Sequence, residues 1–322
     1  MNVRPIMPDE VSMYDQLAVK SGSVFYQSCW ATLHGDRLIR YGIFDKLDRL
    51  QGGFQLFRQR LWGLTIFRNA PFTPFSGPFL TNGKKKNPVA ILEEKRKLLN
   101  AMAGFLDKKS YALLFISFDR HIEDILPFYW RGFKVIPGYT YIVDLKKSID
   151  NIWKDMSQTR RNDISKAKRD GLEARLITDR NAIYSLVCGT FDRKDKELDT
   201  HTLQNILFKY ANKQNSYAFI TYKEDRPLAC CFVIIGGDIA YYLLGGYNYV
   251  EKHHGAGALA IISAIEYAKF LGMRWFDFEG SVIQPIERFF RGFGGCLTPY
   301  FTLNKGWLPV EMTLKLYKRS IF

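Results

Sequence analysis

The chain has 322 residues, of which 47% are hydrophobic and 15% aromatic. This composition excludes a disordered protein and suits two domains of ordinary size, each with its own core. The longest apolar runs, such as Ala229–Gly237, are far shorter than the roughly 20 residues that cross a bilayer. No apolar stretch follows the arginine near the N-terminus, so we expect neither a membrane span nor a signal peptide.

The net charge of +14 favours anionic partners, namely nucleic acid, a nucleotide-linked precursor, coenzyme A or a membrane surface. A generally basic surface that keeps the protein in solution is the alternative. Five cysteines, an odd number without metal-like spacing, predict reduced thiols in a cytoplasmic protein. The adjacent Cys230 and Cys231 lie in a strand-like run and are expected to pack on opposite faces of a strand. The histidines have no suitably spaced acidic or Cys partners, so no metal site is expected.

The first half of the chain contains a loop, a helix and a strand–helix pattern. Pro71–Lys86 is rich in Pro, Gly and Phe, which predicts an ordered surface loop that covers a site. Val89–Leu106 predicts an amphipathic helix, and Ala112–Phe133 follows it. We place the boundary between two domains, residues 1–146 and residues 147–306, near the end of a predicted strand.

The second half alternates helix and strand patterns, which predicts a mixed α/β domain. Asn151–Arg169 predicts one helix, and Gly171 is a typical stop after it. The elements predicted after this helix are strands at Tyr217–Tyr222, Pro227–Ile235 and Ile239–Gly246, a helix at Ala256–Leu271 and a strand at Arg274–Phe278.

The two halves share one pattern. Gly272–Phe293 matches Ala112–Phe133 at a constant offset of 160 positions, so that Phe118 corresponds to Phe278 and Arg131 to Arg291. Each copy follows a predicted helix and continues into a strand. The shared order predicts two tandem copies of one α/β unit, and chance similarity of two aromatic helices is the alternative.

A glycine-rich segment, residues 252–257, separates the strand Ile239–Gly246 from the next helix. Glycines at such a junction let the backbone approach a ligand, and the N–H groups and dipole of the helix favour an anion. A tight turn that serves packing is the alternative. The segment resembles the pyrophosphate-binding turn of the Gcn5-related N-acetyltransferases (GNAT). The resemblance implies that Lys252, Gly255 and Gly257 hold the phosphates of an acyl-CoA donor.

A second motif runs from Phe276 to Ser281 and continues in residues 289–295, Phe-Phe-Arg-Gly-Phe-Gly-Gly. With the basic segment Gln158–Gly171, it resembles the second domain of the Fem aminoacyl transferases, which build the interpeptide bridges of peptidoglycan. The resemblance covers about residues 150–303. It implies a mixed α/β fold of two tandem GNAT-like domains, in which residues 307–322 return to complete the first.

Three features separate the sequence from the Fem pattern. Arg291 replaces a lysine that faces the transfer site, and arginine can stabilise an oxyanion or a phosphate but cannot act as a base. The charged coiled-coil insertion that some Fem proteins use to bind tRNA has no counterpart here. The glycine-rich turn favours acyl-CoA, and aminoacyl-tRNA is the alternative donor.

Attack of an amine on an activated ester needs a proton acceptor beside the reacting nitrogen. Strand alternation predicts that Asp277 and Glu279 share one face, and we expect either carboxylate to orient or deprotonate the amine. A helix cap or an ion pair with an arginine is the alternative for Asp277. The remaining candidates are expected to bind substrate, with packing or a solvated helix face as the alternative: Phe290, Tyr247, Ser281, Arg160 and Arg161.

These features predict an N-acyltransferase that moves an acyl or aminoacyl group to an amine on an anionic acceptor, such as a peptidoglycan or other cell-envelope precursor. The expected location is the cytoplasm, with peripheral membrane contact and tRNA as further partners. One alternative is a non-catalytic protein whose duplicated fold holds nucleic acid or an anionic glycan or lipid. Another is a transferase in which only the second domain keeps a working site.

Overall fold

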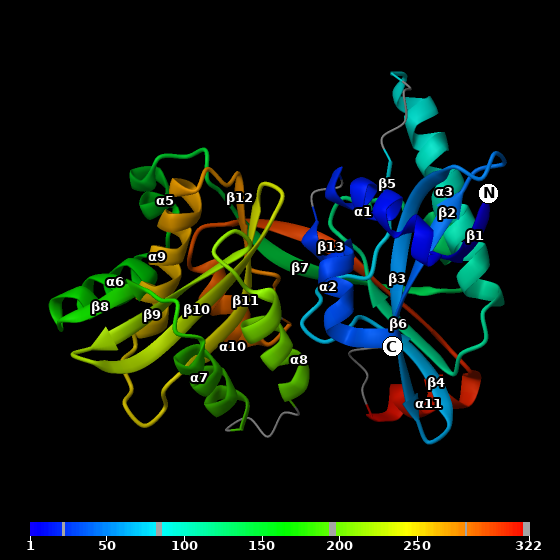
Figure 1. The fold of residues 1–322 in the computed structure, drawn as a ribbon. Helices are drawn as coiled ribbons and strands as arrows, with labels where there is room; N and C mark the ends of the chain where they lie inside the picture. The colour runs from blue at the N-terminus through cyan, green and yellow to red at the C-terminus, as the bar shows by residue number, and fades with distance from the viewer. Residues whose placement is uncertain (21–22, 82–85, 193–197, 281, 318–322) are drawn as a thin grey trace. The chain divides into compact units, whose positions relative to one another are not determined.

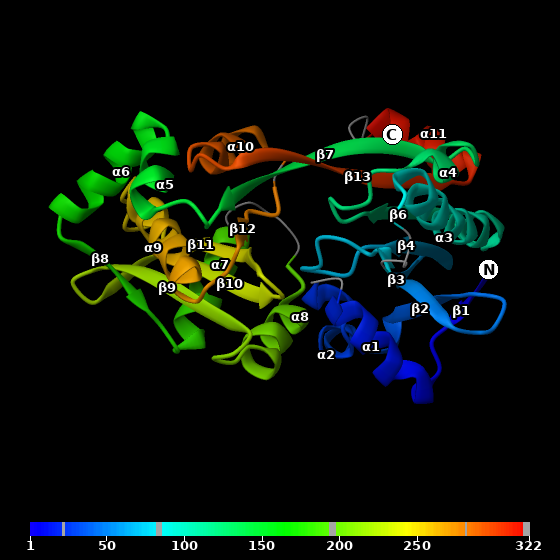
Figure 2. The same ribbon diagram turned by 90° about the horizontal axis from the view of Figure 1, so that it is seen from above.

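The computed structural model describes residues 1–20, 23–81, 86–192, 198–280 and 282–317. The chain forms two compact units, and each is described by itself (Figures 1 and 2). Unit 1 consists of Met1–Gly138 and Pro299–Phe322, and unit 2 of Tyr139–Thr298. None of the described helices is long and apolar enough to cross a membrane.

Unit 1 contains a sheet in the order β1-β2-β3-β4-β6-β13, with β5 paired to β3. All of these pairs are antiparallel except β4–β6, which is parallel. The strands are β1 (Asn2–Pro5), β2 (Leu38–Phe44), β3 (Leu50–Leu61), β4 (Leu64–Arg68), β5 (Phe79–Leu80), β6 (Leu113–Ser117) and the end of β13 (Cys296–Gly306). The helices are η1 (Pro8–Glu10), α1 (Val11–Lys20), η2 (Val24–Tyr26), α2 (Ser28–Ala31), η3 (Thr32–Arg37), α3 (Pro88–Lys108), α4 (Leu126–Tyr129) and α11 (Leu308–Tyr317).

Helices cover both faces of the unit 1 sheet (Figure 2). Leu98, Leu99 and Met102 of α3 pack against strand residues such as Phe54 in the main core of the unit. On the opposite face, a side chain at Gly53 would collide with Tyr14 of α1. The neighbours at positions 53 and 54 therefore point to different helices, as strand alternation requires.

Unit 2 contains a sheet in the order β7-β12-β11-β10-β9-β8, in which only β11–β12 is parallel. Its strands are the end of β7 (Lys134–Asp144), β8 (Leu172–Leu176), β9 (Ser216–Lys223), β10 (Arg226–Gly236), β11 (Ile239–Tyr247) and β12 (Trp275–Asp277). Its helices are α5 (Ile149–Asp155), α6 (Gln158–Arg169), α7 (Arg180–Asp192), α8 (Thr200–Gln204), the π-helix η4 (Asn205–Tyr210), α9 (Ala256–Phe270) and α10 (Gln284–Arg291).

The helices α9 and α7 pack on opposite faces of the unit 2 sheet. Tyr217 and Thr221 of β9 donate hydrogen bonds to carbonyl oxygens of α9, at 2.8 and 2.9 Å. A side chain at Gly246 of β11 would instead meet the backbone of Leu186 in α7. Cys230 and Cys231 are both buried in β10, as predicted.

The two units repeat one mixed α/β arrangement, and each completes its sheet with a strand from the other copy. In both units a short parallel pair, β4–β6 or β11–β12, is followed by an antiparallel partner. That partner is β13 beside β6 and β7 beside β12. The unit bounds therefore lie inside β7 and β13, whereas the sequence placed them at residues 146 and 306. The residue pattern of a strand indicates where that strand ends. It does not indicate which of the two sheets the strand joins.

Two local predictions were wrong. The predicted helix Asn151–Arg169 is two helices, α5 and α6, because Ser157 has an extended backbone and its Oγ caps α6 by accepting a hydrogen bond from Arg160 N. Residues 71–80 are not a surface loop throughout. Phe75 and Ser76 are buried, and Ser76 bonds to the backbones of Gln55 and Ser117, so this segment lies between β3 and β6. Residues 82–85 of the predicted loop lie outside the described residues.

Candidate active site

The parallel strands β11 and β12 pair over three residues and then separate. Ile239–Tyr241 pairs with Trp275–Asp277, where β12 ends, while β11 continues to Tyr247. A register shift against β10 leaves Leu243 as an extra residue in β11. From Tyr242 onward, the edge of β11 that faced β12 has no strand partner among the described residues. Ligands of open α/β sheets bind at the carboxyl ends of such strands, which makes this opening the candidate site.

The N-terminus of α9 follows β11 at this opening. No side chain of a described residue caps the helix, and the first of its N–H groups, that of Ala256, donates to His253 O at 3.0 Å. The two glycines of the turn differ in the space that a side chain would find around them. A Cβ at Gly255 would lie 2.1 Å from the carbonyl oxygen of Asp163, because α6 packs directly against this point. A Cβ at Gly257 would meet only Phe289 Cζ of α10, at 3.7 Å.

The loop between β11 and α9 is held by Tyr247 and His253. The Tyr247 hydroxyl accepts a hydrogen bond from His253 N at 2.7 Å and donates to His253 O at 2.9 Å. The His253 ring lies 2.9 Å from Asp170 at the end of α6. Hydrogen bonds from Lys166 and His253 lower the pKa of Asp170 to about 2. Tyr247 therefore fixes the loop through its hydroxyl, while Lys252 in the same loop is exposed.

The turn after β12 places two carboxyl groups close together. Asp277 is buried and accepts hydrogen bonds from Thr140 Oγ1 at 2.6 Å and from Glu279 N at 2.8 Å. Glu279 has a φ of 56° and Gly280 a φ of 74°, so both have the left-handed conformation that non-glycine residues rarely adopt. The predicted alternation is therefore wrong here. Since β12 ends at Asp277, Glu279 belongs to a turn and not to the strand face of Asp277.

Glu279 combines three unusual features. Besides its left-handed backbone, its Oε1 is buried and has no hydrogen-bond partner among the described residues. Burial, and next the charge of Asp277, raise the pKa of Glu279 well above the usual value. Strained backbone and unsatisfied buried polar groups concentrate at functional sites, and a carboxyl group with a raised pKa can exchange a proton near neutral pH.

Helix α10 lies beside both parts of the site. Its Phe289 is the residue nearest to a Cβ at Gly257, and its Phe290 packs on Phe278 with ring centroids 5.0 Å apart. Phe290 is buried in the core of unit 2 and does not form an exposed wall. The structure thus brings α10, the α9 N-terminus and the turn of Glu279 together.

Arg291 is exposed at the end of α10, and its Nε lies 3.4 Å from Glu287 Oε1. Glu287 also accepts a hydrogen bond from the Tyr141 hydroxyl of β7. Burial, and next Glu287, raise the pKa of Tyr141. Glu287 thereby connects an exposed guanidinium to a buried phenol.

Residues 158–283 match the family model of the acetyltransferase (GNAT) domain. This segment of the chain is therefore similar to a GNAT acetyltransferase domain. The match spans α6 to the turn after β12, so the opening between β11 and β12 lies within the GNAT-like segment.

Solved structures share the fold over nearly the whole chain. The crystal structure of FemX has a TM-score of 0.64 at 14% identity, over 94% of this chain and 97% of that one. The C-terminal domain of a putative lysylphosphatidylglycerol synthetase from Agrobacterium fabrum has a TM-score of 0.58 at 11% identity, over 95% of each chain. A tandem GNAT protein from the clavulanic acid biosynthesis pathway has a TM-score of 0.52 at 12% identity, over 94% and 98%. A sequence comparison with curated proteins finds no significant match.

Two arginines at the start of the GNAT-like segment form structural contacts. Arg160 is buried, donates to Asp163 at 2.9 Å and lies 4.1 Å from the centre of the Phe289 ring. Arg161 donates to the carbonyl oxygens at the end of α5, including that of Met156 at 2.7 Å. Arg160 therefore positions α10, and Arg161 caps a helix, whereas the sequence predicted substrate binding for both, with a solvated helix face as the alternative.

Replacing Arg160 with Ala is expected to lower the free energy of unfolding by about 2–4 kcal/mol, because it removes the stack on Phe289 and leaves Asp163 without its partner. Urea denaturation measures this change. Arg169→Ala, an exposed substitution on the same helix, is the control and should change stability by less than about 0.5 kcal/mol. Equal stability of the two variants would contradict the assigned role.

Some functional candidates were missed or cannot be placed. Ser281 lies outside the described residues. Tyr141 and Glu287 were missed because their contact joins β7 to α10. His121, which the sequence left isolated, bonds to the buried Asp119 in unit 1. The 160-residue offset between the two halves could have indicated Asp119 as a candidate, because it aligns Asp119 with Glu279.

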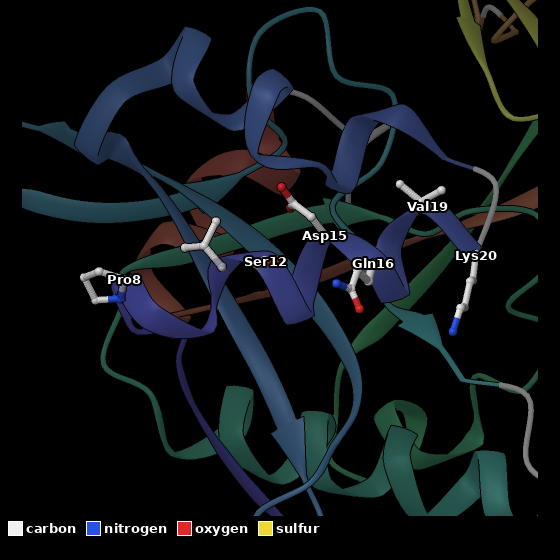
Figure 3. A pocket seen from close by; sticks show the side chains of 7 residues that line it. Pro8, Ser12, Asp15, Gln16, Val19 and Lys20 are labelled. Carbon is white, nitrogen blue, oxygen red and sulfur yellow. The ribbon is translucent and has the colours of Figure 1, made fainter.

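A surface hollow of about 780 Å³ lies along α1 in unit 1 (Figure 3). One face of α1 and the residue Pro8 line it. Among the described residues that line it, Asp15 carries the one carboxylate, which already accepts hydrogen bonds from Ser28 N and Oγ, both at 2.9 Å. The hollow therefore lacks the converging polar groups of a binding site, and we assign it no function.

Proposed function

We propose that the protein is an N-acyltransferase whose active site is the opening between β11 and β12 of the GNAT-like segment. The observation that supports it most is at Glu279, which follows β12 with a left-handed backbone and has a buried carboxyl oxygen, Oε1, without a hydrogen-bond partner among the described residues. A structural role requires neither feature. A group that must take a proton from a substrate amine benefits from both, because burial without a partner raises its pKa.

In the proposed reaction, the amine nitrogen of the acceptor attacks the thioester carbonyl of an acyl-CoA donor. A new C–N bond forms, the C–S bond breaks, and the amine proton passes to the Glu279 carboxylate. The departing thiolate of coenzyme A takes up a proton on release. Asp277 supports the turn, since its carboxylate holds Glu279 N at 2.8 Å and fixes the position of the base.

The donor phosphates are proposed to bind at the start of α9. The first N–H groups of this helix have no side-chain cap, and the backbone at Gly257 is open to approach. The positive end of the helix dipole and the exposed Lys252 add attraction for a pyrophosphate. This arrangement supports acyl-CoA as the donor, with aminoacyl-tRNA as the alternative.

Arg291 is proposed to stabilise the oxyanion or an anionic acceptor, because its positively charged guanidinium is exposed on the helix beside Glu279. An amine on an anionic cell-envelope precursor, including a peptidoglycan precursor, is the proposed acceptor. The net charge of +14 supports an anionic acceptor, and so does the fold shared with a putative lysylphosphatidylglycerol synthetase domain.

Acetyl-CoA is expected to raise the melting temperature of the full chain by a few degrees at saturating concentration, because a ligand that binds only the folded state stabilises it. Lys252→Ala should weaken this shift. Lys213→Ala is the matched control, because Lys213 is exposed and lies near the start of β9, away from the carboxyl end of β11. No shift with acetyl-CoA, combined with transfer activity that ribonuclease abolishes, would assign the donor to aminoacyl-tRNA.

A further inference from the structure

The hairpin between β3 and β4 in unit 1 presents an exposed tryptophan at its tip. Leu61 pairs with Leu64, and between them Trp62 has a φ of 48° and Gly63 a φ of 77°. Two consecutive left-handed residues form the tight turn that suits a two-residue hairpin. Trp62 is 91% exposed, and Leu61 beside it is also exposed. The turn itself requires no large aromatic residue, so Trp62 has no structural function at this tip.

Helix α11 of unit 1 presents a second apolar surface. Leu308, Met312 and Leu316 are spaced by four residues and are 70%, 58% and 75% exposed. Side chains at this spacing lie on one face of a helix. Glu311 points back into unit 1, where it binds Lys134 Nζ at 2.5 Å and Gly306 N at 2.9 Å. The helix is therefore anchored by its polar side, with its apolar stripe outward.

The hairpin tip and α11 lie at the same end of unit 1. Thr65, close to the tip, accepts a hydrogen bond from Ala112 N at 2.8 Å, and Ala112 O accepts one from Trp307 N at 3.0 Å. Trp307 immediately precedes α11 and is itself exposed. In Figure 1 the end of the β3–β4 hairpin and α11 both lie toward the lower end of this unit.

Positive charge accompanies these apolar groups. Arg58 and Arg60 are exposed on the hairpin and form no ion pair with a described residue, and Lys315 is exposed on α11, where its charge also attracts Glu311. The neighbouring acids are already paired, since Asp107 binds Lys305 and Glu311 binds Lys134, each at 2.5 Å. Exposed apolar groups bordered by unpaired cations are typical of surfaces that bind anionic bilayers.

We propose that this end of unit 1 is a peripheral docking face for an anionic lipid bilayer. The docking face consists of Leu61, Trp62, Trp307, Leu308, Met312, Leu316, Arg58, Arg60 and Lys315. The hairpin tip inserts Trp62 at the boundary between headgroups and acyl chains, where its amphipathic ring is favoured. The stripe of α11 lies along the same boundary, and the cations bind lipid phosphates. This inference does not rest on the proposed acyl transfer.

Flotation of the full chain with vesicles tests the proposal. We expect binding to vesicles of phosphatidylcholine with phosphatidylglycerol and much weaker binding to phosphatidylcholine alone. Trp62→Asn should lower the affinity about tenfold or more, and asparagine tolerates the left-handed backbone. Val250→Asn is the matched control, because Val250 is 93% exposed in unit 2 and lies outside the docking face. Unchanged melting temperatures show that both variants fold.

Removing positive charges from the docking face is a second, independent test. Arg58→Gln with Arg60→Gln should weaken binding to the anionic vesicles roughly thirtyfold, at about 1 kcal/mol for each cation. Lys209→Gln with Lys213→Gln, two exposed lysines of unit 2, should leave binding unchanged. Equal binding of the Trp62→Asn variant and the wild type would overturn the proposal. Self-association without vesicles that Trp62→Asn abolishes would also overturn it, because the face would then be a protein interface.

Discussion

Replacing Glu279 with Gln is expected to lower the rate of acyl transfer by a factor of roughly 10²–10⁴, the usual contribution of a positioned general base. Gln fills the same volume and cannot accept the proton of the amine. Donor binding should persist, because the start of α9 is unchanged. Steady-state kinetics with acyl-CoA and an amine acceptor measure the loss, and the acetyl-CoA thermal shift confirms that the donor still binds.

The same variant should also change how the free energy of unfolding depends on pH, which can be measured without substrate. The pKa of Glu279 is raised above its ordinary 4.5 in the folded state. As pH rises through 4.5, the unfolded chain loses this proton while the folded chain keeps it, so folding stability falls until pH reaches the raised pKa. Glu279→Gln should remove this decline, which is at most about 1.4 kcal/mol per pH unit. Urea unfolding across the pH range measures it.

Glu251→Gln is the control for both measurements, because Glu251 forms a partly exposed ion pair with Arg226. It should retain activity and the pH dependence of the wild type. If Glu279→Gln transferred acyl groups at the wild-type rate, Glu279 would not be the base. If only the stability profile changed, the buried carboxyl would be structural and the chemistry would lie elsewhere in the opening.

Replacing Gly255 or Gly257 with Ala is expected to separate packing from donor binding. Gly255→Ala should lower the free energy of unfolding by about 1–3 kcal/mol, because the new Cβ would lie 2.1 Å from the backbone oxygen of Asp163 and must displace α6. Gly257→Ala should change stability by less than about 1 kcal/mol, because its Cβ meets only Phe289 at an ordinary 3.7 Å.

Donor affinity should instead be sensitive to the substitution at Gly257. Gly257→Ala should lower acyl-CoA affinity about tenfold, comparable to losing one hydrogen bond to a charged group, because the methyl group hinders approach to the start of α9. Calorimetric titration measures the affinity, and urea unfolding measures the stability. Unchanged donor affinity in a folded Gly257→Ala protein would place the phosphates away from this turn.

Local patterns in the sequence correctly indicated the elements around the site. The predicted strand Ile239–Gly246 and helix Ala256–Leu271 match β11 and α9 to within one residue at each end. Alternation, helix periodicity and glycine stops are properties of neighbouring residues, so one chain reveals them. The offset that pairs Phe118 with Phe278 indicated the repeated fold for the same reason.

Contacts between distant residues could not be predicted in this way. Arg160 reads as an exposed cation on a basic helix, and only the packing of α10 shows that it is buried against Phe289. Glu279 reads as a strand residue, and its left-handed turn depends on β7, whose Tyr139 carbonyl oxygen would lie 2.0 Å from a Cβ at Gly280. Tyr141 was missed because its partner Glu287 lies 146 positions away.

The sequence by itself determined the mixed α/β class, the tandem repeat, and the two motifs that precede α9 and follow β12. The tertiary structure alone decided which sheet receives β7 and β13, which of the predicted cations are structural, and which carboxyl oxygen is buried without a hydrogen-bond partner among the described residues. The physical reason is that short-range periodicity sets secondary structure, whereas burial and hydrogen-bond satisfaction depend on segments that meet only after the chain has folded.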